Sequence, residues 1–327
     1  MDRITIEIQL KYNSITVDFI KYWFETMSYF KPIRMSGYNL TNRNTRKYYK
    51  NKFYDGIEKE LVNDQAKLEL TGDKNSIRIY KDLSRTKENI WLSCNLNYDI
   101  YKENQKEIME KIDNIMIKYD GIVAYQQSLN DWFWQNNRDI SMYETRGKSL
   151  DNVRFTKSCI FPDKDIVDLE YMPGHTRLAK GLWFGSCWMM WYGEEYYNYV
   201  SKDAIENFND CYENKKISER CTRITLFEDP MDYDSEENRR RQWSFGKKAN
   251  IYEIGKQLKE SDKNISVHDP EMEINSGNFE HGGVRQIIYY YDEKKRPMIK
   301  SKANKKVTYE LDKKGHRIWS KEESINM

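Results

Sequence analysis

Residues 181–197, GLWFGSCWMMWYGEEYY, constrain the fold most, because they carry large apolar side chains at nearly every position. If this stretch is a strand, Trp183 and Phe184 point to opposite faces, and both faces are apolar. Such a strand must be covered on both sides. We therefore expect a central strand that ends near Gly193. The residues at its far end are candidates for contact with a partner at the surface: Trp191, Tyr192, Tyr196 and Tyr197.

Residues 1–145 alternate between strand and helix patterns. Apolar residues alternate with polar ones over 4–10, which predicts a half-buried strand. They recur at helical spacing over 19–30, after a suitable N-cap at Thr16. The next predicted elements are two strands that turn at Gly72–Asn75, a strand at 90–98, a helix at 108–119 and a strand at 121–127. This order fits an antiparallel sheet with helices on one face.

Residues 150–262 predict a second unit of the same kind. A strand runs into a turn at Pro173–Gly174, the aromatic block follows, and Ser201 can cap a helix. Two strands and a helix complete the unit, at 221–227, 242–245 and 251–260. The polar, aperiodic stretch 263–283 is predicted as a linker. The expected fold class is α+β: two antiparallel-sheet units with packed helices, plus a C-terminal β-hairpin appendage.

The C-terminal segment 284–327 contains an internal repeat. YYYDEKKRPMI at 289–299 aligns with YELDKKGHRIW at 309–319, so that Asp292 corresponds to Asp312. Each copy predicts a strand, a charged turn that begins at Asp, and a return strand. The pattern resembles the tyrosine-aspartate hairpin repeats of large bacterial toxin shells, which implies two β-hairpins. Two short hairpins are marginal alone, so we expect the segment to pack on the body or on another chain.

Composition limits the classes of function. The net charge is +2, so no overall field draws the chain to nucleic acid or to a membrane. No apolar run approaches the roughly 20 residues of a membrane span. The five cysteines show no C-x-x-C spacing, which favours reduced thiols in a cytoplasm. We expect no metal and no cofactor. The abundance of Lys, Asn, Ile and Tyr is typical of low-GC bacteria and their phages.

Motifs for catalysis are sparse. The sequence lacks the glycine patterns of phosphate-binding loops, dinucleotide folds and nucleophile elbows. His175 follows Asp165, Asp168 and Glu170, and with one of these acids it could act as a general base or a metal ligand. The alternative is a turn histidine beside an exposed acidic strand, because geometry rather than proximity in sequence makes a base. Cys187, among aromatic residues, is more typical of an inert buried thiol than of a nucleophile.

The stretch 42–53 interleaves basic and aromatic residues. Such a mixture can bind single-stranded nucleic acid through phosphate contacts and stacking. The alternative is an exposed basic helix face whose tyrosines pack inward. The candidate contacts for nucleic acid are Arg43, Arg46, Lys47, Tyr48 and Tyr49.

Two further segments are candidate surfaces for a protein partner. In 131–139, Trp132 and Trp134 share one face if the segment is a strand, and they form either a binding hot spot or part of a core. The acidic loop 228–237 precedes a basic run, and the two either pair with each other or recognise a partner by charge. That run consists of Arg239, Arg240 and Arg241.

The sequence as a whole favours a non-enzymatic protein-binding protein, such as an immunity protein or a phage-type inhibitor that docks on an enzyme or a defence complex. Aromatic and charged residues of the kind enriched at interfaces are abundant, and a hairpin tail can add strands to a partner. The alternatives are a metal- or His-dependent hydrolase or nuclease centred on His175, and a nucleic-acid binder that uses 43–53. The expected partner is a protein; another copy of the chain or nucleic acid is the alternative.

Overall fold

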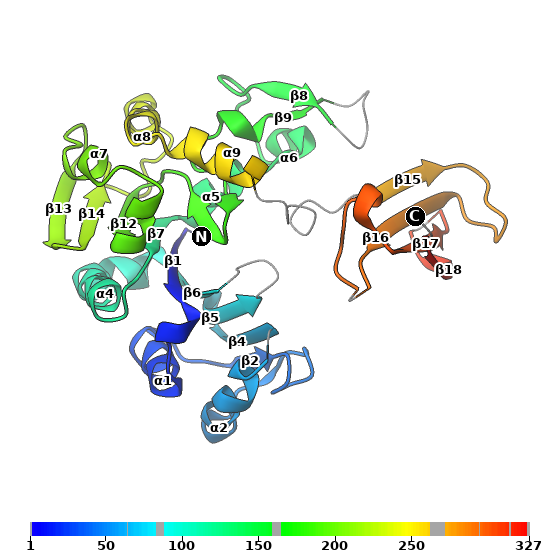
Figure 1. The fold of residues 1–327 in the computed structure, drawn as a ribbon, viewed down its shortest axis with the longest axis horizontal. Helices are drawn as coiled ribbons and strands as arrows, with labels where there is room; N and C mark the ends of the chain where they lie inside the picture. Colours follow the sequence, from blue (N-terminus) through cyan, green and yellow to red (C-terminus); the bar gives the residue numbers. More distant parts are fainter. Residues whose placement is uncertain are drawn as a thin grey trace. The chain divides into compact units, whose positions relative to one another are not determined.

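The computed structural model describes residues 2–63, 65–82, 88–158, 165–261, 272–293, 295–313 and 315–325 (Figure 1). The chain forms two compact units, each from two stretches of sequence. Unit 1 comprises Met1–Arg138 and Leu169–Leu258, and unit 2 comprises Asp139–Asp168 and Lys259–Met327. Helices and antiparallel strands alternate along the chain, so the predicted α+β class is confirmed.

Unit 1 is built on a ten-stranded sheet in which neighbouring strands are antiparallel. The order from edge to edge is β13 (Glu213–Ser218), β14 (Cys221–Thr225), β12 (Met189–Gly193), β7 (Val123–Ser128), β1 (Arg3–Lys11), β6 (Asn89–Asn97), β5 (Asn75–Asp82), β4 (Gln65–Gly72), β2 (Arg34–Gly37) and β3 (Arg46–Lys47). Because β7 pairs with both β1 and β12, one sheet joins strands from both predicted units. The division of the chain at 1–145, 150–262, 263–283 and 284–327 stays a prediction.

Helices α1 (Val17–Thr26), α2 (Lys50–Leu61) and α4 (Tyr98–Lys118) lie along one face of this sheet (Figure 1). As predicted, Thr16 caps α1, because its side-chain oxygen accepts a hydrogen bond of 3.1 Å from the amide of Phe19. Every second residue of β1 from Ile4 to Leu10 is buried. Periodicity in the sequence succeeds here because it records which side of each element is covered.

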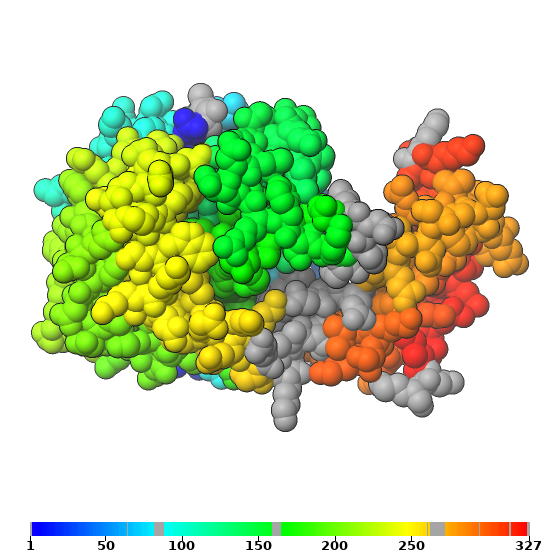
Figure 2. Space-filling view, turned by 90° about the horizontal axis from the view of Figure 1, so that it is seen from above, coloured from blue at the N-terminus to red at the C-terminus, as the bar shows by residue number. Residues whose placement is uncertain are grey.

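The segments that follow β7 cover the other face of the sheet near β1 and β12. The amide of Trp183 donates to Oε1 of Gln9 in β1, 3.0 Å away, and Phe245 packs on Tyr192 of β12. In the space-filling view, the yellow-green to yellow segment forms one closely packed face of unit 1 (Figure 2). This segment contains α7 (Lys202–Glu206), α8 (Glu236–Lys248) and α9 (Ile251–Ser261).

Three predicted elements differ from the structure. Residues Leu129–Gln135 form the helix α5 rather than a strand, and the Ser128 side chain caps it. The aromatic block is split: β11 (Leu182–Phe184) pairs with β10 (Arg177–Ala179), whereas β12 belongs to the large sheet. Gly185 permits the turn between them, because a Cβ there would collide with the Trp183 ring. The predicted strand at 242–245 lies inside α8.

Unit 2 contains α6 (Ile140–Thr145) and the paired strands β8 (Phe155–Lys157) and β9 (Asp165–Val167). Its second stretch forms a four-stranded antiparallel sheet in the order β15 (Met272–Ser276), β16 (Arg285–Tyr291), β17 (Lys305–Leu311) and β18 (Arg317–Ser324). Strand β15 lies within the stretch predicted as a linker, because Met272 and Ile274 pair with Tyr289 and Ile287 and share their apolar face.

The two copies of the internal repeat form the same turn. The amides of Lys295 and Gly315 each donate to the carbonyl of the repeat aspartate, Asp292 or Asp312, over 3.0 Å, and both have positive φ angles, 59° and 85°. In the second copy the turn joins β17 to β18, as predicted. In the first copy the return segment makes a single bridge at Pro297 rather than a strand, and the short helix η5 (Lys300–Lys302) follows.

Candidate functional site

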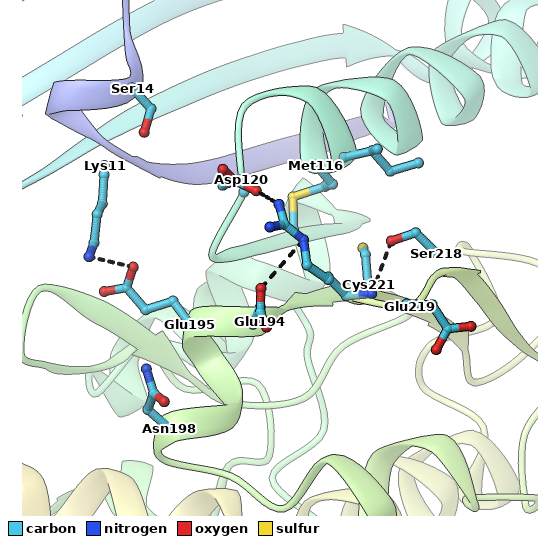
Figure 3. A pocket seen from close by; sticks show the side chains of 13 residues that line it. Lys11, Ser14, Met116, Asp120, Glu194, Glu195, Asn198, Ser218, Glu219 and Cys221 are labelled. Atoms are coloured by element: carbon cyan, nitrogen blue, oxygen red, sulfur yellow. Dashed lines mark hydrogen bonds and ion pairs between the residues drawn. The ribbon is translucent and has the colours of Figure 1, made fainter.

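A cleft of about 660 Å³ opens in unit 1 where four separate parts of the chain meet (Figure 3). These parts are the end of β1 with the short helix η1 (Tyr12–Ser14), the end of α4, the helix η3 (Glu194–Asn198), and the turn between β13 and β14. The side chains around it include Lys11, Ser14, Met116, Ile117, Asp120, Glu194, Glu195, Asn198, Ser218, Glu219, Arg220 and Cys221.

Two glycines hold these parts together. The amide of Gly193, at the end of β12, donates to the carbonyl of Ile122 over 2.9 Å. A Cβ at position 193 would collide with the carbonyl oxygen of Gly121, in the turn after α4. The end of α4 and the start of η3 can therefore approach each other only because residue 193 has no side chain. This approach places Asp120 and Glu194 where both can pair with Arg220.

The charged groups in the cleft are already engaged in ion pairs. Nζ of Lys11 lies 2.8 Å from a carboxylate oxygen of Glu195, and this hydrogen bond raises the pKa of Lys11 (Figure 3). Arg220 pairs with Asp120, and its Nε lies 3.4 Å from Glu194. These pairs are partly exposed, so each contributes little to stability. Their effect is to hold the side chains in position around the cleft.

Carboxylates outnumber cations around the cleft. The lining has four carboxylates and two cations: Asp120, Glu194, Glu195 and Glu219, with Lys11 and Arg220. The carboxylate of Glu219 also pairs with Lys216 outside the cleft, at 2.6 Å, and this pair lowers the pKa of Glu219. Ile117 adds a large apolar side chain that is 42% exposed. The cleft thus combines an excess of negative charge with an apolar rim.

The lining groups are suited to recognition rather than to nucleophilic chemistry. The Cys221 side chain is buried, and burial raises the pKa of its thiol to about 12, so the reactive thiolate is scarce at neutral pH. The hydroxyl oxygen of Ser218 accepts a hydrogen bond from the backbone amide of Arg220, 3.2 Å away. The arrangement can bind a complementary charged group.

The structure shows partners for His175 and Glu170, and a catalytic role for them stays a prediction. Nδ1 of His175 lies 3.0 Å from the amide oxygen of Asn136, which also accepts from the amide of Thr176. The carboxylate of Glu170, in the helix η2 (Leu169–Tyr171), pairs with Arg177 at 3.5 Å. Asp165 and Asp168 belong to unit 2, whereas His175 belongs to unit 1. Across the ranges that the structure describes, no three His, Cys, Asp or Glu side chains group as metal ligands.

Most of the aromatic partner candidates are buried, which corrects the expectation for the end of the block. Trp191, Tyr192 and Tyr196 have no exposed surface. Nε1 of Trp191 donates to Asp113 of α4 over 2.6 Å, and the Tyr196 hydroxyl donates to the carbonyl of Trp183 over 3.1 Å. Layers on both faces of the sheet enclose them. Tyr197 is partly buried, and its hydroxyl donates to the carbonyl of Tyr192.

Helix α5 separates the two tryptophans that a strand would have placed together. Trp134 is buried, whereas Trp132 is 37% exposed. Neighbours two residues apart in a helix point in different directions. Trp132 therefore remains a candidate contact for a partner, and Trp134 belongs to the interior.

The three arginines of α8 pair with acids, as one of the two interpretations expected. Arg239 holds the buried carboxylate of Asp131 at 2.6 Å. Arg240 makes two hydrogen bonds to Asp210, of 2.7 and 2.9 Å, and it also binds Glu237. Arg241 pairs with Glu237 at 3.2 Å. Asp131 and Asp210 lie outside the predicted acidic loop, and nothing in the local sequence pattern identified them.

The cleft residues were not singled out from the sequence. Lys11, Asp120, Glu194 and Arg220 stand at ends of predicted strands and helices, where charged residues are common. The one local signal is the Asp-Gly turn at 120–121, which marks a tight reversal but says nothing about the partners of Asp120.

Comparisons with known proteins do not identify a family for this chain. No protein-family model matches the sequence, and no curated protein matches it. Among solved structures, the chain is similar to the T6SS protein PA0821 of Pseudomonas aeruginosa, with a TM-score of 0.47 and 10% sequence identity. The similarity covers 77% of this chain and 74% of that one. Such a distant likeness carries no argument about function. Within the described ranges, no helix has the length and apolar character needed to cross a bilayer.

Proposed function

We propose that this chain is a non-enzymatic protein that binds a protein partner, in the manner of an immunity protein or an enzyme inhibitor. The observation that supports this most is the cleft of Figure 3, where fixed charges of both signs and an exposed apolar side chain surround one opening. Charge complementarity of this kind steers association and sets specificity. A cytoplasmic location and association between copies stay predictions.

The partner group that suits the cleft is a basic side chain with an apolar stem, such as arginine or lysine. The carboxylates of Asp120, Glu194 and Glu219 are mostly exposed. Each keeps oxygen atoms that can accept further hydrogen bonds from a guanidinium or ammonium group. Ile117 can then contact the methylene groups of the same side chain.

The test is capture of the partner with a tagged chain from its native host, followed by measured affinity for the purified partner. The double variant Glu194→Gln, Glu219→Gln removes two cleft charges and should weaken binding by about tenfold. The matched control is Glu58→Gln, Glu103→Gln, which removes two exposed carboxylates from α2 and α4 outside the cleft. Equal binding by both double variants, or purification without any partner, would contradict the proposal.

A further inference from the structure

The sheet of unit 1 ends at β3, a strand of two residues with a neighbour on one side. Arg46 and Lys47 pair with Met35 and Arg34 of β2, and β3 closes the strand order of the described sheet. The outer side of a terminal strand presents amide and carbonyl groups that another strand can pair with.

Exposed cations surround this strand. We call them the basic edge: Arg34, Arg43, Arg46, Lys47, Lys50 and Lys52. Among the described residues, none of the six makes an ion pair. Three of them lie over tyrosine rings instead: Arg43 over Tyr38, Lys47 over Tyr49 and Lys50 over Tyr54, at 5.2, 5.9 and 6.0 Å from the ring centres.

Unpaired like charges repel one another, so the basic edge costs the folded protein stability. An anionic partner would remove that cost. Apolar surface adjoins the charges, because Ile33 and Tyr49 are 55% and 57% exposed, and the amide of Tyr48 donates to the carbonyl of Ile33. The surface therefore fits a partner that carries acidic groups together with apolar ones.

The aromatic residues favour a protein partner over nucleic acid. Single-stranded nucleic acid binds on several exposed rings, on which successive bases stack. Here Tyr49 is exposed, whereas Tyr48 and Tyr54 are half-buried and pack on Phe53, with ring centres 6.1 and 5.6 Å away. The alternative expected for the segment 42–53, inward tyrosines below basic side chains, thus describes Tyr48 but not Tyr49.

We propose that the basic edge binds an extended, acidic segment of a protein partner, which adds to the sheet beside β3. Main-chain hydrogen bonds to β3 align the segment, and acidic side chains opposite Arg46 and Lys47 meet those cations on the two faces of the sheet. This inference rests on the proposed protein-binding function, and it concerns the opposite end of the sheet from the turn between β13 and β14 that lines the cleft.

The test uses a fluorescent peptide of about ten residues that repeats Glu-Glu-Val-Val, which places acidic side chains on both faces and is long enough to form one strand. The charge-reversed variant Arg46→Glu, Lys47→Glu should bind it about tenfold more weakly than the wild type. The matched control is Lys215→Glu, Lys216→Glu on β13, the strand at the other edge of the same sheet, and it should bind like the wild type. Thermal unfolding of both variants checks that they fold.

Two further probes separate the modes of binding. A peptide with the same residues but N-methylated at every residue keeps its charge and loses the amide donors of both strand edges, so its binding should be lost. If it binds as well as the unmodified peptide, strand addition is wrong. Tighter binding of a labelled oligothymidylate than of the peptide would assign the edge to nucleic acid and overturn the inference. If the cleft variant loses the partner and the basic-edge variant still binds it, the proposed function stands and only the inference about the basic edge is refuted.

Discussion

The two charged regions of unit 1 differ in whether their charges are paired within the chain. In the cleft, Lys11 and Arg220 are each held by carboxylates. At the basic edge, six cations are exposed and lack such partners in the described structure. Paired charges keep their side chains in place at little cost, whereas unpaired charges of one sign repel each other and depend on salt. The side chains of the cleft are therefore held in a defined geometry, whereas the basic edge attracts anions.

The largest expected change in stability comes from the buried ion pair between Asp113 of α4 and Arg223 of β14. Asp113 of α4 accepts hydrogen bonds from the buried guanidinium of Arg223, at 2.8 and 3.0 Å, and from Trp191. Asp113→Ala leaves a buried charge with only the carboxylate of Glu213, and should cost about 4 kcal/mol of unfolding free energy. Chemical denaturation measures this. Asp55→Ala, at an exposed position of α2, is the control, and a similar loss there would refute the explanation.

The next largest change in stability is expected at Gly193, where the start of η3 approaches the turn after α4. Gly193→Ala places a methyl group against the carbonyl of Gly121, which should cost about 3 kcal/mol of unfolding free energy. It should also weaken partner binding, because Asp120 and Glu194 separate. Ser14→Ala, which removes a hydroxyl from the same cleft, should change stability by less than about 0.5 kcal/mol. If both variants are equally stable, the close approach is not what holds the cleft.

A third charged group, in β1 between the two regions, should show in the pH dependence of stability. Glu7 is half-buried; desolvation raises its pKa from 4.5 to about 7, although the hydroxyl of Ser93 donates to it over 2.7 Å. Because the pKa of Glu7 is higher in the folded than in the unfolded state, protonation of Glu7 stabilises the folded protein. This stabilisation is fully present below about pH 4.5 and is lost as the pH rises through about 7.

The variant Glu7→Gln removes that titration. It should be more stable than the wild type at pH 8 by on the order of 2 kcal/mol, with a smaller difference at pH 4.5. Denaturation curves at several pH values test this. The same difference at every pH would show that Glu7 does not titrate as its burial predicts.

The smallest expected effects come from removing one cation in each region, and the two changes in unfolding free energy should have opposite signs. Lys11→Gln breaks a surface pair with Glu195 and should destabilise the protein by about 0.5 kcal/mol. Lys47→Gln removes one unpaired cation and should stabilise it by about 0.3 kcal/mol. Both changes should shrink in about 0.5 M salt. Changes of the same sign at low salt would remove the distinction between the regions.

Local patterns in the sequence predicted those elements whose burial is regular. The alternation over β1 and the helical spacing over α1 each reflect one apolar buried face, and both elements lie where the pattern put them. The other face of β1 is covered as well, at the polar residues Thr5 and Gln9. For 131–139 the sequence left open whether the two tryptophans share the face of a strand, and a serine cap in fact begins a helix there. The prediction failed inside 181–197, because a run that is apolar throughout has no period to show where one strand ends and another begins.

The sequence by itself determined the α+β class, the burial of the first part of the aromatic block and the numbers of each charge. Only the tertiary structure decided which charges meet. Arg220 and Asp120 are a hundred positions apart, and they are brought together because β12 pairs with both β7 and β14. Among the described residues, Arg46 and Lys47 have no such partners, and β3 is the last strand of the sheet. Pairing between distant strands leaves no local period in the sequence, so the contrast between the cleft and the basic edge appears only in the folded chain.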